Sequence, residues 1–100
     1  MSALASKIRL ETDGGRGRYV TALPDGSEAE MTYVEGRPGV VIILHTYTPP
    51  KHRGRGIAAA LVKKSVEDFR AGKKKVVPAC SFARRQFAQN PGWADLIADG

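Results

Sequence analysis

Two arginines and two glycines alternate over residues 53–56, and this short segment carries the clearest chemical signal of the 100-residue chain. It lies between an apolar run, Val40–Leu44, and an amphipathic stretch, Ile57–Ala71, so we expect it to join a strand to a helix. The first turn of a helix has backbone N–H groups without intrahelical partners and the positive end of the helix dipole. Glycine lets an anion come close to those amides. The segment therefore predicts a backbone cradle for a phosphate group.

The flanking residues agree with a phosphate site. Lys51 adds positive charge to that of Arg53 and Arg55, and Pro49-Pro50 stiffens the approach because each ring fixes φ. Ala58-Ala59-Ala60 keeps the start of the helix small. Two other phosphate loops do not fit, because the lysine–serine/threonine ending of a Walker A loop and the spacing GxGxxG are both missing. The alternative is a basic turn whose glycines serve geometry alone.

The charge of the chain is concentrated behind this segment. The formal net charge is +6, yet residues 1–50 hold five Lys/Arg against six Asp/Glu. Residues 51–85 hold eleven against two, a balance of +9. Such a field attracts polyanions, whether nucleic acid, an acidic membrane or a nucleotide cofactor with several phosphates. A solvated basic surface is the alternative.

The first half of the chain predicts an antiparallel meander of about four strands, separated by glycine-containing turns. In the third strand, Ala29, Met31 and Tyr33 are expected to share one face. The fourth is a continuous β-branched run, which predicts a central strand buried on both faces. The four expected strands are Ile8–Thr12, Arg18–Leu23, Glu28–Val34 and Val40–Leu44.

The second half changes to helical spacing. Apolar residues recur through Ile57–Ala71 at the period of an amphipathic helix, and Gly72 suits the position just past its end. The strand Val76–Pro78 should return parallel to the fourth strand through a crossover. A short helix over Cys80–Gln89, with Ser81 as N-cap, and a last turn over Trp93–Ile97 complete the expected domain. The fold class is α/β (α+β), with a mixed sheet and short C-terminal helices.

Length and composition predict one domain over residues 1–100. No apolar run approaches the roughly 18–20 residues that a membrane span needs. Met1–Leu10 lacks the apolar core and cleavage site of a secretory leader. Cys80 is the one cysteine and cannot form an internal disulfide, which favours a reducing, cytoplasmic setting.

The order of strand, Pro-x-x-Arg-Gly-x-Gly-Ile-Ala and amphipathic helix resembles the acyl-coenzyme A motif of the GNAT superfamily of N-acetyltransferases. The superfamily pattern (Gln/Arg)-x-x-Gly-x-(Gly/Ala) falls on residues 51–56, with lysine in place of the first residue. The chain is most similar to the very short stand-alone proteins of that superfamily. The segments that carry this likeness are His45-Thr46, Pro49-Pro50, Arg53–Ala58 and Val76–Phe82, together with the Ala29–Tyr33 strand and the Asn90–Leu96 tail.

The resemblance implies a truncated GNAT fold without the N-terminal helical substrate-binding region. It implies acetyl-CoA as co-substrate and no metal, with the pyrophosphate on the amides of Arg53–Ala58 and the pantetheine arm beside Thr46–Thr48. Arg84, Arg85 and Lys73–Lys75 could reach the 3′-phosphate, although a solvated surface is the simpler interpretation of the lysines. The expected coenzyme-binding residues are Thr46, Tyr47, Thr48, Lys51, His52, Arg53, Gly54, Arg55, Gly56, Ile57, Ala58 and Arg84, with His52 either a phosphate neighbour or simply exposed.

Acetyl transfer to an amine needs a path for one proton, and His45 and Cys80 are the candidate catalytic residues. His45 is expected at the end of the buried strand, where it could relay a proton; the alternative is a half-buried histidine satisfied by a neighbouring carbonyl. Cys80 opens the second helix near Arg84 and Arg85, a setting that lowers a thiol pKa in general. The resemblance implies a place near the CoA sulfur for this cysteine; the alternative is an inert buried thiol.

Three functions follow from the sequence. The first is a small acetyl-CoA-dependent N-acetyltransferase acting on a small-molecule or protein amine. The second is an acyl-CoA-binding module without transfer activity. The third, a basic nucleic-acid-binding protein, ranks last because Phe69 and Phe82 are the only aromatic residues within the basic region 51–85. A second copy of the chain could supply walls for the acceptor amine, whose identity the sequence leaves open.

Overall fold

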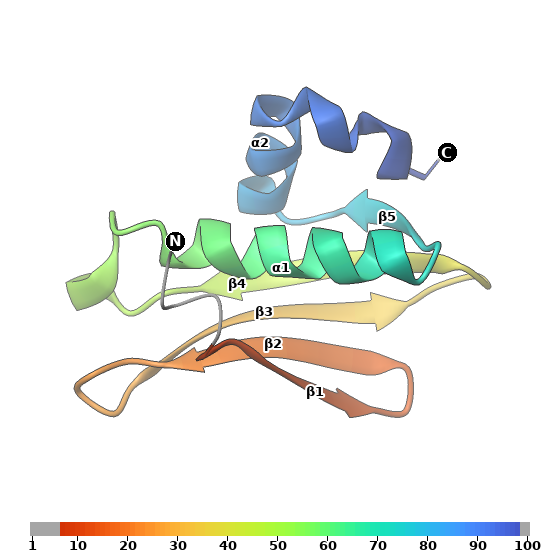
Figure 1. Ribbon diagram of the computed structural model, residues 1–100. Coiled ribbons are helices and arrows are strands. Elements are labelled where there is room, and N and C mark those ends of the chain that lie inside the picture. The colour runs from red at the N-terminus through yellow and green to blue at the C-terminus, as the bar shows by residue number, and fades with distance from the viewer. Residues whose placement is uncertain (1–6, 99–100) are drawn as a thin grey trace.

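The computed structural model describes residues 7–98, so most of Met1–Leu10 lies outside the description. The described residues form a five-stranded sheet in the order β1-β2-β3-β4-β5, with β4 and β5 parallel and the other pairs antiparallel (Figure 1). The predicted meander followed by a strand–helix–strand crossover is confirmed. The elements are β1 (Arg9–Asp13), β2 (Arg16–Ala22), β3 (Glu28–Glu35), β4 (Val40–Tyr47), the 3-10 helix η2 (Pro50–His52), α1 (Ile57–Ala71), β5 (Lys75–Pro78), α2 (Ser81–Gln89) and the 3-10 helix η3 (Pro91–Leu96).

Helix α1 covers one face of the sheet and makes the core with it (Figure 1). Its bounds are those that the apolar spacing predicts, and its buried face meets the core-facing residues of the strands. Phe69 packs edge-on against two tyrosine rings, Tyr19 and Tyr33, with centroids 6.2 and 5.0 Å away. The Tyr19 hydroxyl reaches the carboxylate of Asp68 at 2.9 Å, which satisfies the polar end of a buried ring.

Strand β4 agrees with the prediction only in its first half. Val40 and Val41 face opposite sides of the sheet and are both buried, but Leu44 is 48% exposed, so burial on both faces ends before Leu44. The reason is a β-bulge: Thr32 of β3 faces His45 whereas the next residue, Tyr33, faces Ile43. Leu44 is the extra residue, which the ladder leaves without a partner and turns outward.

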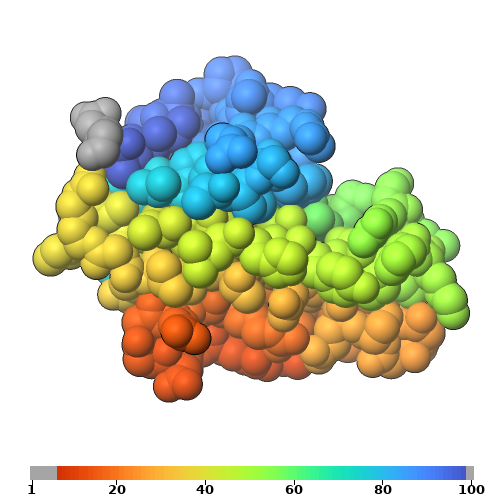
Figure 2. Space-filling view, turned by 180° about the vertical axis from the view of Figure 1, so that it is seen from behind, coloured from red at the N-terminus to blue at the C-terminus, as the bar shows by residue number. Residues whose placement is uncertain are grey.

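The sheet face opposite α1 carries an ionic network over β1–β3, and Figure 2 shows this part of the chain (red to orange) from that side. The Arg18 guanidinium contacts three carboxylates, those of Glu11, Glu28 and Glu30, at 2.8, 2.8 and 2.5 Å. Its hydrogen bonds hold the pKa values of Glu11 and Glu28 below their ordinary range. Charged side chains therefore cover the sheet face that lies opposite α1.

One helix end differs from the sequence analysis and one agrees with it. Cys80, not Ser81, is the N-cap of α2: its Sγ accepts a hydrogen bond from the Ala83 amide at 3.2 Å. Gly72 lies just past the end of α1, as expected, and the left-handed residue is the next one, Lys73, with φ 58°. The Lys73 and Lys74 amides donate back to the carbonyls of Arg70 and Phe69, which closes the last turn.

Candidate anion-binding and active site

A groove of about 530 Å³ opens where β4 ends and α1 begins. Three parts of the chain form its walls: the end of β4, the loop that enters α1, and one face of α2. Figure 2 shows it as a notch between this loop (green) and α2 (blue). The lining residues are Thr46, Tyr47, Thr48, His52, Arg53, Gly54, Gly56, Ile57, Ala58, Ala59, Phe82 and Gln86.

The floor of the groove is a backbone cradle, residues 53–58. Gly54 and Gly56 have φ of 82° and 76°, in the left-handed region that favours glycine. Gly56 is the N-cap of α1, and no described side chain caps the amides of the first turn. A Cβ built on either glycine would point into space that is free of described atoms within 4 Å. The cradle thus offers unpaired amides, a helix dipole and room for an anion.

The side chains of two arginines in the cradle, Arg53 and Arg55, contact neighbouring residues of the protein. The Arg53 Nε donates to the Thr48 carbonyl at 2.9 Å, and its guanidinium lies 6.0 Å from the centroid of the Tyr47 ring. The Arg55 guanidinium lies 3.5 Å from Nδ1 of His52. These contacts keep positive charge beside the groove.

The end of β4 offers a free strand edge to the groove. β5 pairs with β4 only as far as Ile43, where the Ala79 amide donates to the Ile43 carbonyl at 3.0 Å. Over residues 44–47, no described strand pairs with this edge. Nearby, the Thr48 hydroxyl is buried and lacks a hydrogen-bond partner within the described chain. An extended ligand with amide groups would satisfy both kinds of polar group.

His45 follows the bulge and is exposed, contrary to the half-buried interpretation. Its ring stacks on that of Tyr47 with centroids 6.5 Å apart. By register His45 lies opposite Thr32, whereas Thr46 lies opposite the buried Met31 and lines the groove. His45 therefore projects from the sheet face that points away from α1, beside the bulge.

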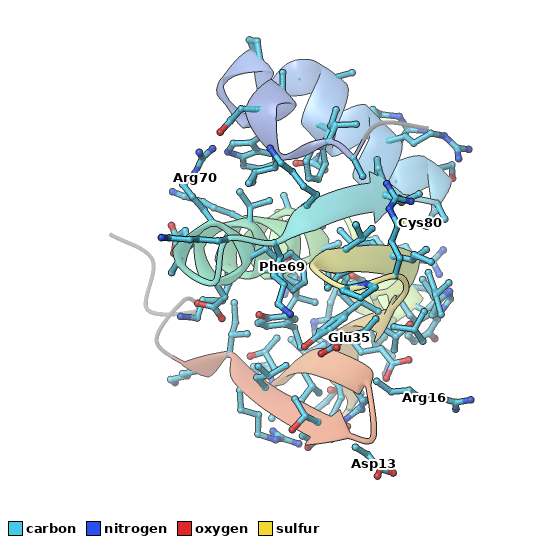
Figure 3. The ribbon with its side chains drawn as sticks, turned by 90° about the vertical axis from the view of Figure 1, so that its right-hand side faces the viewer. Asp13, Arg16, Glu35, Phe69, Arg70 and Cys80 are labelled. Carbon is cyan, nitrogen blue, oxygen red and sulfur yellow. The ribbon has the colours of Figure 1, made fainter. Side chains whose placement is uncertain are left out.

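Cys80 lies where β5 turns into α2 (Figure 3). The thiol is half-buried against the core, and the Ala83 amide binds its sulfur. Neither Cys80 nor His45 belongs to the groove lining. The two candidate catalytic residues thus lie outside the walls of the groove.

The structure brings together most of the predicted coenzyme-binding residues and leaves three outside. Lys51, Arg55 and Arg84 do not line the groove, and the Arg84 guanidinium donates to the Ala79 carbonyl at 3.0 Å. Sequence reasoning missed the wall that α2 supplies. Phe82 and Gln86 stand four residues apart on one helix face, a spacing that was available as a signal.

For His52 the sequence left two alternatives, a phosphate neighbour or a simply exposed residue. The side chain is 8% exposed and lines the groove, so the second alternative is wrong. The 3-10 turn η2 directs the ring inward, where Nε2 lies 3.2 Å from the Asp25 carboxylate in the β2–β3 turn. Hydrogen bonds from the Ser27 hydroxyl and amide, and then that from His52, hold the pKa of Asp25 far below its ordinary range.

Within residues 7–98, no helix is both long and apolar enough to cross a bilayer. In the same range, no three His, Cys, Asp or Glu side chains gather as a metal site would require.

The site is a groove formed by the end of a bulged strand β4, a glycine-containing loop and the uncapped start of α1, within an α/β domain. The sequence model of the GCN5-related N-acetyltransferase family matches residues 18–96, and the chain belongs to this family. The fold is similar to the solution structure of a GCN5-like candidate N-acetyltransferase from Staphylococcus aureus. The two chains share 22% identity at a TM-score of 0.71, over 95% of this chain and 92% of that one. At this identity the likeness establishes the fold, and the family supports an acetyltransferase function.

Proposed function

We propose that this protein is an acetyl-CoA-dependent N-acetyltransferase that acts on an amine. The cradle carries the proposal: two left-handed glycines, uncapped amides at the start of α1 and an empty space beside them fit a pyrophosphate. The family membership of the chain supports the same ligand. When bound, acetyl-CoA supplies an acyl group on a thioester.

Each wall of the groove has a part in binding this co-substrate. The amides of residues 54–58 bind the pyrophosphate, and nearby arginine charge adds to its attraction. The free edge at Thr46–Thr48 pairs with the amides of the pantetheine arm, and the Thr48 hydroxyl gains a partner there. Phe82 provides an apolar wall on the α2 side. These contacts hold the arm along β4, toward the bulge at Leu44.

The acceptor must reach the acyl group as a free amine, and one proton must leave during transfer. His45 projects beside the bulge, exposed and able to take that proton. Cys80 sits at the point where β4 and β5 separate, near the place proposed for the CoA sulfur. In this proposal the amine attacks the acyl carbonyl directly, a C–N bond replaces the C–S bond of the thioester, and coenzyme A leaves as a thiolate that takes up a proton. A polyamine, a protein lysine and an N-terminus are all chemically suitable acceptors.

Replacement of His45 by alanine should lower kcat about a hundredfold while the affinity for acetyl-CoA stays within about twofold, since proton transfer contributes roughly 10²–10⁴-fold. The measurement is steady-state thiol release, with calorimetry for binding. Leu44→Ala, at a neighbour that is also exposed, is the control for damage to the bulge. An unchanged kcat in His45→Ala would remove the histidine from the mechanism.

Cys80→Ser separates two roles of the cysteine. Serine is a good N-cap, so the melting temperature should hold, whereas Cys80→Ala should cost about 1 kcal/mol because the Ala83 amide loses its acceptor. If the thiol lies near the thioester, Cys80→Ser should still lower kcat about tenfold. Equal turnover in wild type and Cys80→Ser would assign the residue to capping alone.

The test of the function is a titration with acetyl-CoA by calorimetry, followed by an assay of free thiol release with a panel of amines. We expect binding, and release above buffer background with at least one amine. Binding without release would favour the module without transfer activity, which the position of His45 and Cys80 outside the groove makes the second candidate. No binding at millimolar acetyl-CoA would contradict both functions.

A further inference from the structure

His52 connects two parts of the fold that the sequence separates widely. Its ring lies between the β2–β3 turn and the cradle, which stand at the same end of the molecule in Figures 1 and 2. Nε2 faces the carboxylate of Asp25 at 3.2 Å, and Nδ1 faces the guanidinium of Arg55 at 3.5 Å. The ring also lines the groove. A buried titratable group thus touches a fixed anion on one side and the cradle on the other.

On the Nε2 side of His52, the Asp25 carboxylate remains ionised. Oδ1 of Asp25 accepts hydrogen bonds from the Ser27 amide and hydroxyl, at 3.1 and 2.6 Å, which leaves Oδ2 for His52. Because these contacts depress the pKa of Asp25, the carboxylate stays charged throughout the neutral range. A fixed carboxylate at one ring nitrogen stabilises the imidazolium form.

On the Nδ1 side, the positive guanidinium of Arg55 opposes a positive charge on the ring. A guanidinium can only donate, so Nδ1 must be an acceptor and the ring neutral when Arg55 contacts it. Lys51 and Arg53 flank the histidine in the same loop, and the first turn of α1, residues 57–60, bears no charged side chain. Arg55 is thus the charged side chain that contacts the ring on this side.

We propose that His52 is a proton-coupled ligand of the anion in this cradle. When a phosphoryl group enters, Arg55 turns from Nδ1 to the phosphate, and Nδ1 takes one proton from solvent. The new N–H then donates to a phosphate oxygen, while Asp25 balances the imidazolium through Nε2. No other bond forms or breaks. The inference rests on the proposed function in one respect, that the ligand is the pyrophosphate of coenzyme A.

The test uses dephospho-coenzyme A, because its pyrophosphate, unlike the 3′-phosphate of coenzyme A, has no proton to gain between pH 5.5 and 8.5. Calorimetry at several pH values, in two buffers of different ionisation enthalpy, measures both Kd and proton uptake. We expect uptake of up to one proton near neutrality. A gained charge-assisted hydrogen bond should make Kd about tenfold lower at pH 5.5 than at pH 8.5.

Matched variants assign the proton. His52→Gln retains an N–H that reaches Asp25 but cannot titrate, so its binding should show neither proton uptake nor dependence on pH between 5.5 and 8.5. Asp25→Asn keeps an acceptor for Ser27 and loses the charge, so uptake near neutrality should fall. Asp13→Asn is the control: Asp13 points outward from the β1–β2 hairpin (Figure 3), and the same change there should alter nothing.

The outcomes separate this inference from the function itself. Tight binding without proton uptake, and with the same Kd at every pH, would overturn the role of His52 and leave coenzyme A binding intact. Equal proton uptake in wild type and His52→Gln would also overturn it, because the proton would then belong to another group. Absence of binding at all pH values would contradict the proposed function. Nitrogen-15 spectra of the His52 ring give a direct check, because Nδ1 should gain a proton only in the complex.

Discussion

Gly56→Val is expected to lower the affinity for coenzyme A at least a hundredfold while the protein remains folded. Gly56 has φ 76° and caps α1, a conformation that costs a β-branched residue about 1–2 kcal/mol or more. Relief of that strain turns the first amides of α1 away from one another. The side chain would also extend into the space beside the cradle, where no described atom lies within 4 Å of the Cβ. Loss of one or two charge-assisted hydrogen bonds, about 1.5–3 kcal/mol each, accounts for a hundredfold change.

Gly39→Val is the matched control. Gly39 has φ 78° and, like Gly56, open space within the described structure around a built Cβ, but it lies in the turn between β3 and β4. Both variants should lose similar stability in denaturant unfolding, and only Gly56→Val should lose binding in calorimetry. Equal binding by the two variants would place the coenzyme elsewhere. Circular dichroism of both proteins shows that the comparison is made between folded chains.

The sequence was sufficient for the parts of the fold that depend on local pattern. The apolar spacing of Ile57–Ala71 and the glycine before it predict where α1 begins and ends, and the helix has these bounds. The cradle was predictable for the same reason, because a glycine-rich junction between a strand and a helix is a local property. The parallel return of β5 follows from a general rule of chain connection.

The other features of the fold and the site depend on contacts between residues far apart in the sequence, which no local pattern encodes. The β2–β3 turn was predicted, but its Asp25 meets a histidine 27 positions away. The bulge at Leu44 falls at the end of the apolar run Val40–Leu44, which predicts regular pairing, and the register between β3 and β4 decides its place. The sequence offers both Cys80 and Ser81 as the N-cap of the second helix. Because α2 begins at Ser81, the cap falls on the cysteine.

Gly17→Ala is expected to destabilise the protein by about 3 kcal/mol, which lowers the melting temperature by roughly 12–24 °C in a domain of this size. The ring of Tyr33 lies directly over Gly17 of β2, so that a built Cβ would overlap its Cε2 and Cζ atoms. The ring cannot simply move aside, because Tyr19 and Phe69 pack against it. Gly92→Ala, in η3, has open space within the described structure and an ordinary backbone, and should leave the melting temperature within a few degrees.

The double variant Gly17→Ala with Tyr33→Leu tests the cause. If overlap with the ring is responsible, the double variant should be less destabilised than the sum of the two single variants, by about 1–2 kcal/mol. Additive losses would show that Gly17 acts through its backbone instead. The same variants probe the groove, since Tyr33 pairs with Ile43 at the bulge, where β4 leaves its regular register. A displaced Tyr33 should therefore weaken acetyl-CoA binding even in the fraction of Gly17→Ala protein that stays folded, whereas Gly92→Ala should bind normally.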